Sequence, residues 1–188
     1  MSHPASGIRS GDLATGLIEP EEMPSVSGTI VPHSLFLVTR DPAPLAGMAF
    51  PDWDGLSWAN LAALGLEHVV CLTDEVCPYD PAPLRLLLPI RLQDLVGGTT
   101  PDDPVVEERR VRQAALAVLS KLRGGEGVVV HCAGGTGRTG TILGCALRGL
   151  GYSSDEVLSY LDRLTKARGR QGWPESQWQA MMVRKFMP

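Results

Sequence analysis

The stretch of residues 128–140 constrains the fold of this chain more than any other. It reads Val-Val-Val-His-Cys-Ala-Gly-Gly-Thr-Gly-Arg-Thr-Gly. The run of valines is typical of a buried strand, because β-branched residues favour extended backbone. Small residues follow Cys132, and beyond Arg138 apolar residues recur with helical spacing from Ile142 to Leu150. We therefore expect a strand, a tight loop and a helix, with a cysteine at the start of the loop and an arginine at its end.

Each residue type in this loop favours the binding of an anion. A loop of Gly, Ala and Thr can turn successive backbone N–H groups into one concavity. The helix that follows adds unpaired N–H groups and the positive end of its dipole. Arg138 can donate two parallel hydrogen bonds to a tetrahedral oxyanion. The sulfur of Cys132 would lie at the bottom of this electropositive cup, where a thiolate is stabilised and can attack the phosphorus of a bound phosphate.

The residues His131-Cys132, five further residues and Arg138-Thr139 resemble the signature of the cysteine-dependent protein phosphatases, the superfamily of tyrosine and dual-specificity phosphatases. The loop is similar to that of the small dual-specificity-like branch, which reads Cys-x-Gly-Gly-x-Gly-Arg-Thr-Gly. The resemblance implies a phosphoric monoester hydrolase with a phosphocysteine intermediate and no metal or other cofactor. It implies that Cys132 is the nucleophile, that Thr139 hydrogen-bonds the sulfur and that His131 orients the loop. The phosphate would be held by Arg138 and by the backbone of Ala133, Gly134, Gly135, Thr136 and Gly137.

The leaving group must also receive a proton, which requires a general acid within reach. In the family that the loop resembles, an aspartate does this from a mobile loop roughly 30 to 40 residues before the cysteine. Asp94 lies 38 residues before Cys132 and follows an apolar run, so we expect Asp94 to be the acid. Asp102 and Asp103 remain alternatives, and Asp103 also fits the N-cap of a helix that begins at Pro104.

Two other phosphate-binding motifs overlap this loop and fit it less well. The glycine spacing in residues 135–140 matches the dinucleotide pattern, which needs an acidic residue on the next strand about 20 residues further on. The acids at that distance, Asp155 and Glu156, begin a helical pattern instead. The nucleotide-binding pattern G-x-x-x-x-G-K-[ST] fails because Cys132 replaces its first Gly and Arg138 replaces its Lys.

Strand-like and helix-like segments alternate along the chain, which predicts an α/β fold. We expect a single domain with a central, mostly parallel sheet flanked by helices, and the resemblance implies the protein-tyrosine-phosphatase-like version of it. Residues 1–27 mix Ser, Gly, Pro and acids without periodicity, so we expect a flexible lead-in before a catalytic domain over residues 28–188. The segments expected to be strands are 35–38, 68–72, 84–92 and 128–130, those expected to be helices are 56–64, 104–122, 138–150, 154–164 and 174–186, and 41–53 is expected to be a loop.

Composition limits the partners of the chain. The net charge is −4 among 188 residues, which gives no basic footprint for nucleic acid or for an anionic membrane. No apolar run approaches the roughly 20 residues needed to cross a bilayer. We see no secretory signal and no disulfide-rich or metal-binding cysteine spacing among the four cysteines, which favours a cytoplasmic location. We expect a monomer that binds no nucleic acid and no membrane.

The substrate is expected to be a phosphoprotein or a small phosphate ester. Phosphoinositide-directed relatives carry lysines within the loop, and residues 133–136 contain none, which favours phosphotyrosine proteins, with phosphoserine and phosphothreonine as further substrates. A phosphoinositide phosphatase and a non-catalytic phosphate-binding module remain alternatives. Gln177 resembles a family glutamine that helps to position water, although a plain surface glutamine fits the pattern too.

Overall fold

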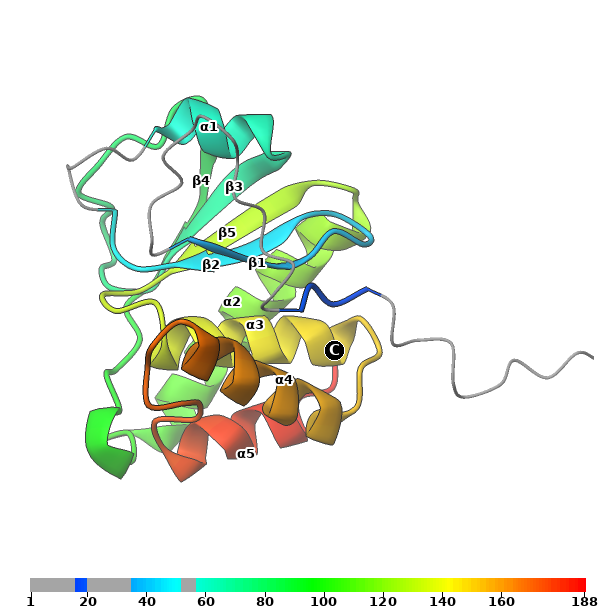
Figure 1. The fold of residues 1–188 in the computed structure, drawn as a ribbon. Helices are drawn as coiled ribbons and strands as arrows, with labels where there is room; N and C mark the ends of the chain where they lie inside the picture. The colour runs from blue at the N-terminus through cyan, green and yellow to red at the C-terminus, as the bar shows by residue number, and fades with distance from the viewer. Residues whose placement is uncertain (1–15, 20–34, 52–56) are drawn as a thin grey trace, which may run out of the picture.

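The structure is a computed structural model that describes residues 16–19, 35–51 and 57–188 (Figure 1). Most of the predicted lead-in over residues 1–27, and the predicted start of the catalytic domain at residue 28, lie outside these ranges. The boundary between the two therefore stays a prediction. Of the described part of the lead-in, Leu17 forms an antiparallel bridge with Thr39, and the backbone N–H of Ile18 donates to the carbonyl of Val38 at 2.9 Å.

A sheet of five strands forms the centre of the fold. The strands are β1 (Phe36–Thr39), β2 (Leu45–Met48), β3 (Leu66–Cys71), β4 (Arg85–Pro89) and β5 (Gly127–His131). Their order across the sheet is β1-β2-β5-β3-β4. Among these five strands, β1 and β2 pair antiparallel, whereas β5 pairs in parallel with β2 and with β3, and β3 pairs in parallel with β4. The expected single α/β domain with a mostly parallel sheet is confirmed.

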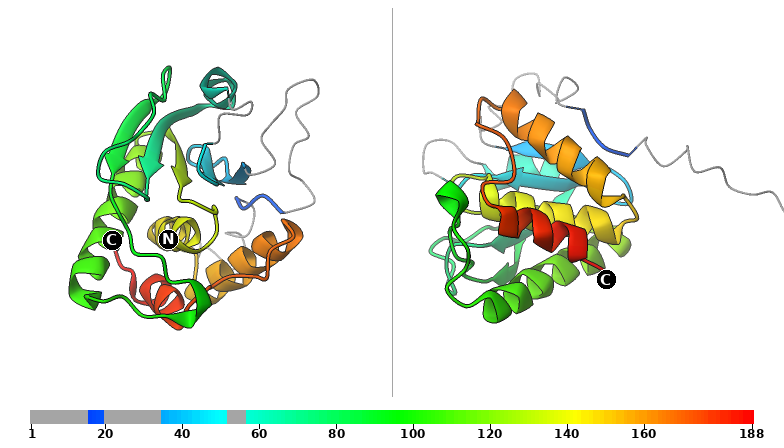
Figure 2. Two further views of the ribbon diagram at one scale, coloured as in Figure 1. Left: turned by 90° about the vertical axis from the view of Figure 1, so that its left-hand side faces the viewer. Right: turned by 90° about the horizontal axis from the view of Figure 1, so that it is seen from below.

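Helices cover both faces of this sheet (Figures 1 and 2). They are α1 (Trp58–Ala63), α2 (Pro104–Arg123), α3 (Gly137–Gly149), α4 (Ser154–Ala167) and α5 (Gln177–Lys185). Helices α2 to α5 lie on one face and the short α1 lies on the other. Helix α3 is central to its layer, since it packs on β2 and β5 and also contacts α2, α4 and α5. Within the described residues, no helix has the length and apolar character needed to cross a bilayer.

The core explains why these segments fold as they do. The apolar stripe of α2 is buried at Val111, Ala114, Val118 and Leu122, and the larger core cluster also contains Trp178 of α5. Burial of such apolar stripes contributes about 1.5–3 kcal/mol per large side chain. A second, smaller cluster on the α1 face includes residues of β1, β2, β3 and β5. The sheet is therefore buried between two apolar layers, as parallel sheets require.

The expectation of a loop over residues 41–53 is wrong in its middle, where Leu45–Met48 forms β2. The prolines at 42 and 44 and the Ala-Gly pair at 46–47 gave the segment a loop-like composition. The strand forms because it pairs with β5, from Leu45 opposite Val128 to Met48 opposite His131. Tertiary pairing of this kind overrides a weak local propensity for strand.

The topology places the cysteine loop where parallel sheets bind ligands. Strand β5 ends at His131, beside Met48 at the end of β2 and Cys71 at the end of β3. The loop of residues 132–136 leaves this carboxyl edge in the middle of the sheet and enters α3. Such an edge, between parallel strands that are connected through helices, is the usual position of an active site in open α/β sheets.

Candidate active site

The loop that follows β5 curls back so that its backbone faces the cysteine. The side chain of Cys132 is 3% exposed, and its sulfur accepts a hydrogen bond from the backbone N–H of Gly135 at 3.2 Å. Gly135 has φ = +67°, and an added Cβ there would lie 2.6 Å from the backbone of Met48 and Ala49. Only glycine fits this left-handed position and this close approach to the end of β2. The small residues of the loop therefore serve its curvature.

Helix α3 begins without a capping side chain. Thr136 is its N-cap residue, and its hydroxyl makes no capping hydrogen bond. By contrast, Asp103 caps α2, and Ser153 and Ser176 form capping boxes at the starts of α4 and α5. The N-cap side chain thus leaves the first-turn N–H groups of α3 to other partners, and the carboxyl group of Glu175 lies beside the first of these residues, Gly137. Of the described helices of eight or more residues, α3 alone begins in this way.

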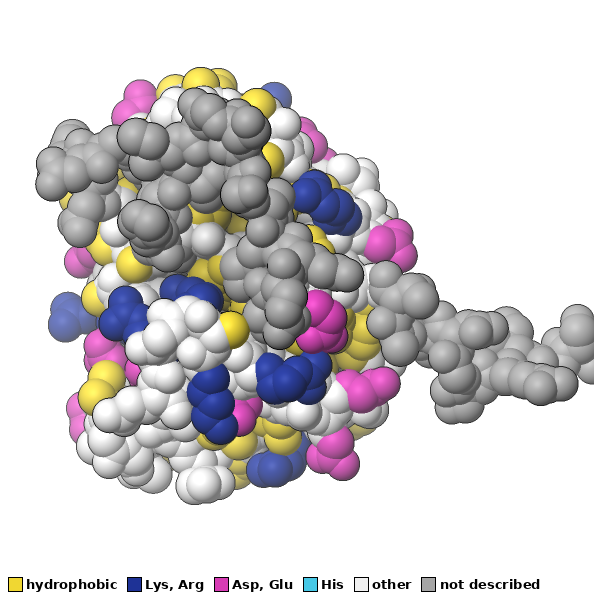
Figure 3. All heavy atoms as spheres, in the orientation of Figure 1, with side chains coloured by type: hydrophobic (Ala, Val, Ile, Leu, Met, Phe, Trp, Pro, Cys, Tyr) yellow, Lys and Arg dark blue, Asp and Glu magenta, His cyan; other side chains and the backbone are white. Residues whose placement is uncertain are grey.

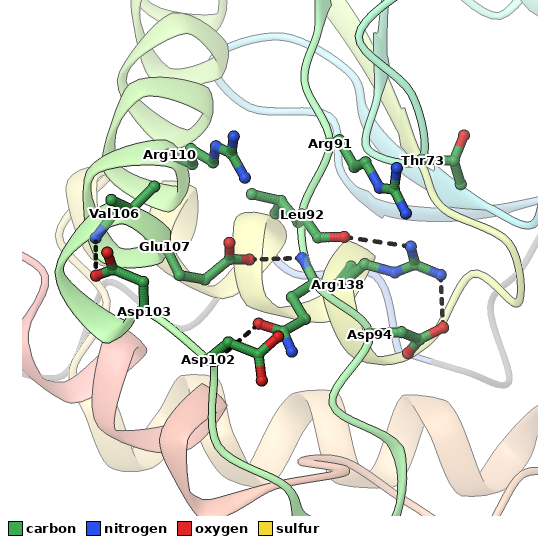
Figure 4. Close-up of a pocket in the computed structure, with 11 residues that line it drawn as sticks. Thr73, Arg91, Leu92, Asp94, Asp102, Asp103, Val106, Glu107, Arg110 and Arg138 are labelled. Carbon is green, nitrogen blue, oxygen red and sulfur yellow. Dashed lines mark hydrogen bonds and ion pairs between the residues drawn. The ribbon is translucent and has the colours of Figure 1, made fainter.

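Arg138 connects the loop to the segment that carries Asp94. One terminal nitrogen of its guanidinium lies 2.7 Å from the carboxylate of Asp94, and the other donates to the carbonyl of Leu92 at 3.4 Å (Figure 4). The side chain of Arg138 is 11% exposed, and its buried Nε has no hydrogen-bond partner among the described residues. Since a buried donor without a partner is costly, this N–H is suited to an oxygen of a bound phosphate.

The structure separates the three candidate acids. Asp94 is half-exposed and faces Arg138 across the site. Asp103 caps α2, because its carboxylate accepts hydrogen bonds from the N–H groups of Val105 and Val106 at 3.1 and 3.0 Å. Asp102 is exposed and lines the same cavity of about 520 Å³ as Asp94 and Arg138. Asp94 is therefore the candidate that the fold brings into contact with the arginine of the loop.

The segment that carries Asp94 is fixed through Gln93. The backbone N–H of Gln93 donates to the carboxylate of Glu107 at 2.8 Å, and its side-chain oxygen accepts from the N–H of Asp102 at 2.9 Å (Figure 4). Glu107 is 4% exposed, and burial raises the pKa of its carboxyl, an effect that the hydrogen bond from Gln93 and the charges of Arg110 and Arg138 oppose. Glu107 thus ties the segment before Asp94 to α2.

His131 is fully buried beneath the loop. Its Nε2 hydrogen-bonds the hydroxyl of Tyr79, its carbonyl accepts from the N–H of Leu72 at 2.9 Å, and Phe50 packs edge-on against its ring at 5.6 Å. Burial lowers the pKa of the imidazole to about 4, so the ring is neutral near pH 7. These contacts fit a residue that orients the loop, and that role stays a prediction.

Thr139 and Gln177 do not make the contacts that the sequence predicted for them. Thr139 is buried in the first turn of α3, and its hydroxyl has no hydrogen-bond partner in the part of the chain that the structure describes. Gln177 is exposed on the first turn of α5. The side chains that face the start of α3 belong instead to Glu175 and Gln179, as the space around Gly137 shows.

Arg168, at the end of α4, supports the loop from behind and was not predicted. Its guanidinium donates to the carbonyl of Gly135 at 3.1 Å and lies 3.7 Å above the ring of Phe36. Burial lowers the pKa of this guanidinium to about 10, whereas the charge of Cys132 acts in the opposite direction. The sequence gives no signal for this role, because it depends on how α4 packs beside β1.

A second cavity, of about 480 Å³, opens on the other side of the loop. It is lined by Gly134 and Thr136, by Val96 and Gly97 of the segment after Asp94, and by residues 170–175. The first cavity is thus lined partly by α2 and the second partly by the connection between α4 and α5. Over α4, Lys and Arg side chains are interspersed with Asp and Glu (Figure 3), in ion pairs such as that of Lys166 with Asp162 at 2.7 Å.

One cluster of potential metal ligands occurs among the described residues, far from this loop in the sheet. Glu67, His68 and Glu126 lie near the start of β3, at the sheet edge opposite to Cys132. Glu126 already pairs with His68 at 2.7 Å and with Lys121 at 3.0 Å. The lysine supplies the positive charge that a cation would bring, so the cluster is explained as an ion-pair network.

Comparison with known proteins finds a family and a fold. The model of the family PTP-SAK, described as the Swiss Army Knife protein DSP-PTPase phosphatase domain, matches residues 40–178. A variant of P. aeruginosa TpbA in complex with pTyr is 19% identical, with a TM-score of 0.55, over 84% of this chain and 92% of that one. PTPMT1 in complex with PI(5)P is 17% identical, with a TM-score of 0.54, over 76% of this chain and 88% of that one.

A third solved structure is the core catalytic domain of the PP-IP phosphatase SIW14 from S. cerevisiae. It is 16% identical, with a TM-score of 0.51, over 76% of this chain and 80% of that one. At these identities the three similarities concern the fold alone. These three proteins are a phosphatase variant bound to pTyr, a protein bound to PI(5)P and a PP-IP phosphatase, and these descriptions apply to those proteins alone.

The buried His131 predicts a pH dependence of stability. Its folded pKa of about 4 lies below the ordinary value of 6.5, so the unfolded chain takes up the proton first as the pH falls. The stabilisation is present above about pH 6.5 and is lost as the pH falls toward about 4, up to roughly 3 kcal/mol. Urea unfolding across this range should show a smaller loss for His131→Gln than for the wild type. Equal losses in the two proteins would contradict the prediction.

Proposed function

The chain belongs to the DSP-PTPase phosphatase family of cysteine-dependent phosphatases, and we propose that it hydrolyses phosphotyrosine in proteins through a phosphocysteine intermediate, without a metal. The observation that supports this most directly is the contact between Arg138 of the loop and Asp94, 2.7 Å apart. It links the phosphate-binding arginine to a carboxyl group that can exchange a proton. The sulfur of Cys132, at the base of the same loop, supplies the nucleophile.

In the first step, the thiolate of Cys132 attacks phosphorus and a sulfur–phosphorus bond forms. The bond from phosphorus to the leaving oxygen breaks, and that oxygen takes a proton from the carboxyl group of Asp94. Arg138 and the N–H groups of the loop and the first turn of α3 hold the equatorial oxygens, over which negative charge is spread in a loose transition state.

In the second step, water attacks the phosphocysteine. The carboxylate of Asp94 accepts the proton of the water, the sulfur–phosphorus bond breaks, and inorganic phosphate and the thiolate of Cys132 are released. The Cys132 sulfur leaves more readily because it is hydrogen-bonded by the N–H of Gly135. A hydrogen bond from Thr139 to the sulfur would act in the same sense.

The substrate class follows from the charge and openness of the loop. Residues 133–137 offer no lysine, so the loop binds one phosphate through its backbone and Arg138. The cavities of about 520 and 480 Å³ on either side leave room for the chain on both sides of a phosphorylated residue. An extended phosphopeptide fits such a surface, and the open rim also admits phosphoserine and phosphothreonine.

The nucleophile is tested by turnover of a small aryl phosphate in the presence of a metal chelator. The wild type should hydrolyse it, and Cys132→Ser should lose all measurable turnover while remaining folded. Cys77→Ser is the matched control, because Cys77 is a half-buried cysteine outside the loop, and it should retain the rate. A folded wild type without turnover, or a Cys132→Ser protein with full turnover, would refute the mechanism and favour a phosphate-binding module.

The general acid is tested by three parallel substitutions. Asp94→Asn should lower kcat for an ester with a poor leaving group by about 10²- to 10⁴-fold, and far less for a good leaving group. Asp102→Asn and Asp103→Asn should retain the rate, and asparagine at 103 still caps α2. A full rate for Asp94→Asn on the poor leaving group would show that another residue donates the proton.

The alternative of a phosphoinositide or other small phosphate-ester phosphatase is tested by comparing kcat/KM between substrates. A phosphotyrosine peptide should be hydrolysed faster than a phosphoserine or phosphothreonine peptide, and faster than phosphatidylinositol phosphate in neutral lipid vesicles, because the loop has no lysine for a second phosphate. Faster hydrolysis of the lipid would instead favour the phosphoinositide alternative.

A further inference from the structure

The carbonyl groups of the loop after Cys132 are tied to the surrounding fold. Between residues 133 and 136, three backbone carbonyls accept hydrogen bonds of 3.1 Å or less. Their donors are the N–H of Phe50 for Ala133 (3.0 Å), the guanidinium of Arg168 for Gly135 (3.1 Å) and the N–H of Gly140 for Thr136 (2.7 Å). Two of these donors belong to the backbone. The guanidinium of Arg168 is the donor that a substitution can remove.

The N–H groups of the same stretch have different partners. That of Gly135 donates to the sulfur of Cys132 at 3.2 Å. That of Thr136 makes no hydrogen bond within the part of the chain that the structure describes, although Thr136 is 8% exposed. A buried backbone donor without a partner is costly. The N–H of Thr136 is therefore suited to an acceptor that enters the loop from outside.

Arg168 determines which way the peptide between Gly135 and Thr136 faces. This peptide bond is trans, so its C=O and its N–H point in opposite directions. The guanidinium holds the C=O on the side of α4, and the N–H of Thr136 then points away from α4. With φ = +67° at Gly135, the N–H groups of Gly135 and Thr136 turn toward one concavity, where the first of them meets the sulfur of Cys132.

A loop of this composition needs such a support. Gly134 and Gly135 have no Cβ, and glycine adopts either sign of φ at little cost. Rotation of the peptide between Gly135 and Thr136 would turn its carbonyl oxygen toward the sulfur and toward a bound phosphate. Both carry negative charge in the proposed mechanism, so the rotated loop would bind phosphate poorly. The hydrogen bond from Arg168 opposes this rotation.

The side chain of Arg168 is itself held by α4 and β1. Arg168 is the C-cap residue of α4, and its N–H donates to the carbonyl of Leu164 at 3.3 Å. Its guanidinium lies 3.7 Å from the centre of the ring of Phe36, which is 4% exposed. A guanidinium that stacks on a buried ring is already oriented, so it loses little further freedom when it donates to Gly135.

We propose that Arg168 is a positioning residue for phosphate binding, which orients the peptide between Gly135 and Thr136 so that the N–H of Thr136 donates to a phosphate oxygen. The proposal rests on the proposed function and deepens it, because it names a support of the same anion site. Arg168 acts here through the peptide and not by contact with the phosphate. If its role were purely structural, loss of Arg168 would lower stability and leave the affinity of the folded protein for phosphate unchanged.

The test is a titration of isotope-labelled protein with inorganic phosphate, followed by NMR spectra of the backbone amides. Arg168→Met keeps a long side chain in contact with Phe36 but removes the donor, whereas Arg168→Lys keeps one donor group on a flexible stem. Arg148→Met is the matched control. Arg148 is also half-buried and donates to a backbone carbonyl, that of Tyr152, at the far end of α3 from the loop.

In the wild type, phosphate should shift the amide signal of Thr136 downfield, because its N–H gains a charged acceptor. Arg168→Met should bind phosphate at least about tenfold more weakly, the effect of losing one hydrogen bond to a charged group. Its Thr136 signal should shift less at saturation. Arg168→Lys should lie between the two, because an ammonium can reach the same carbonyl but lacks the planar fork. Arg148→Met should match the wild type in affinity and in the Thr136 shift.

Wild-type affinity for phosphate in a folded Arg168→Met protein, or an unchanged Thr136 shift at saturation, would overturn the proposal. Urea unfolding of the same variants measures stability separately, and a loss of stability alone would assign Arg168 a structural role. If Arg168→Met does not fold, Arg168→Lys decides, and wild-type affinity together with a wild-type Thr136 shift would then overturn the proposal.

A failure of the proposed function gives a different result, because phosphate binding requires no turnover. It would appear as a folded wild type that binds phosphate without hydrolysing an aryl phosphate. An active wild type whose Arg168→Met variant binds phosphate normally would leave the phosphatase assignment intact and remove the role of Arg168.

Discussion

The uncapped start of α3 is the constraint on which the rest of the structure depends. The other long helices that the structure describes satisfy their first N–H groups with a side chain of Asp103, Ser153 or Ser176. At α3 the N-cap side chain supplies no such hydrogen bond, and the carboxyl group of Glu175 lies beside the first residue of the helix. The loop before the helix is packed against β2, and α3 itself is enclosed by the sheet and three other helices.

The supports of this site come from distant parts of the chain. Arg168 at the end of α4 holds the carbonyl of Gly135, and Trp173 holds the carbonyl of Gly137. On the opposite side, Glu107 of α2 fixes the backbone just before Asp94. Contacts from elements that are far apart in the sequence thus hold the loop in its conformation. This is why an active site built from a short motif still needs a complete domain around it.

The residues of the site that could be predicted from the sequence are those recognised by their spacing within a short segment. Cys132 and Arg138 are separated by a fixed short spacing, and the cap Asp103 is recognised from its position directly before Pro104. The fold class followed from the alternation of strand and helix patterns. Strand β2 was missed because its stability comes from pairing with β5. Arg168 and Glu175 were missed for the same reason, since only tertiary packing brings them to the loop, and Gln177 was expected there although the start of α5 turns it to solvent.

The contact between Arg138 and Asp94 also has a consequence for how the site exchanges ions. In the structure the guanidinium already has a carboxylate of the protein as its counter-ion, so in the proposed mechanism a phosphate would enter by exchanging one counter-ion for another. In the same mechanism, departure of the product phosphate would restore the contact between Arg138 and Asp94.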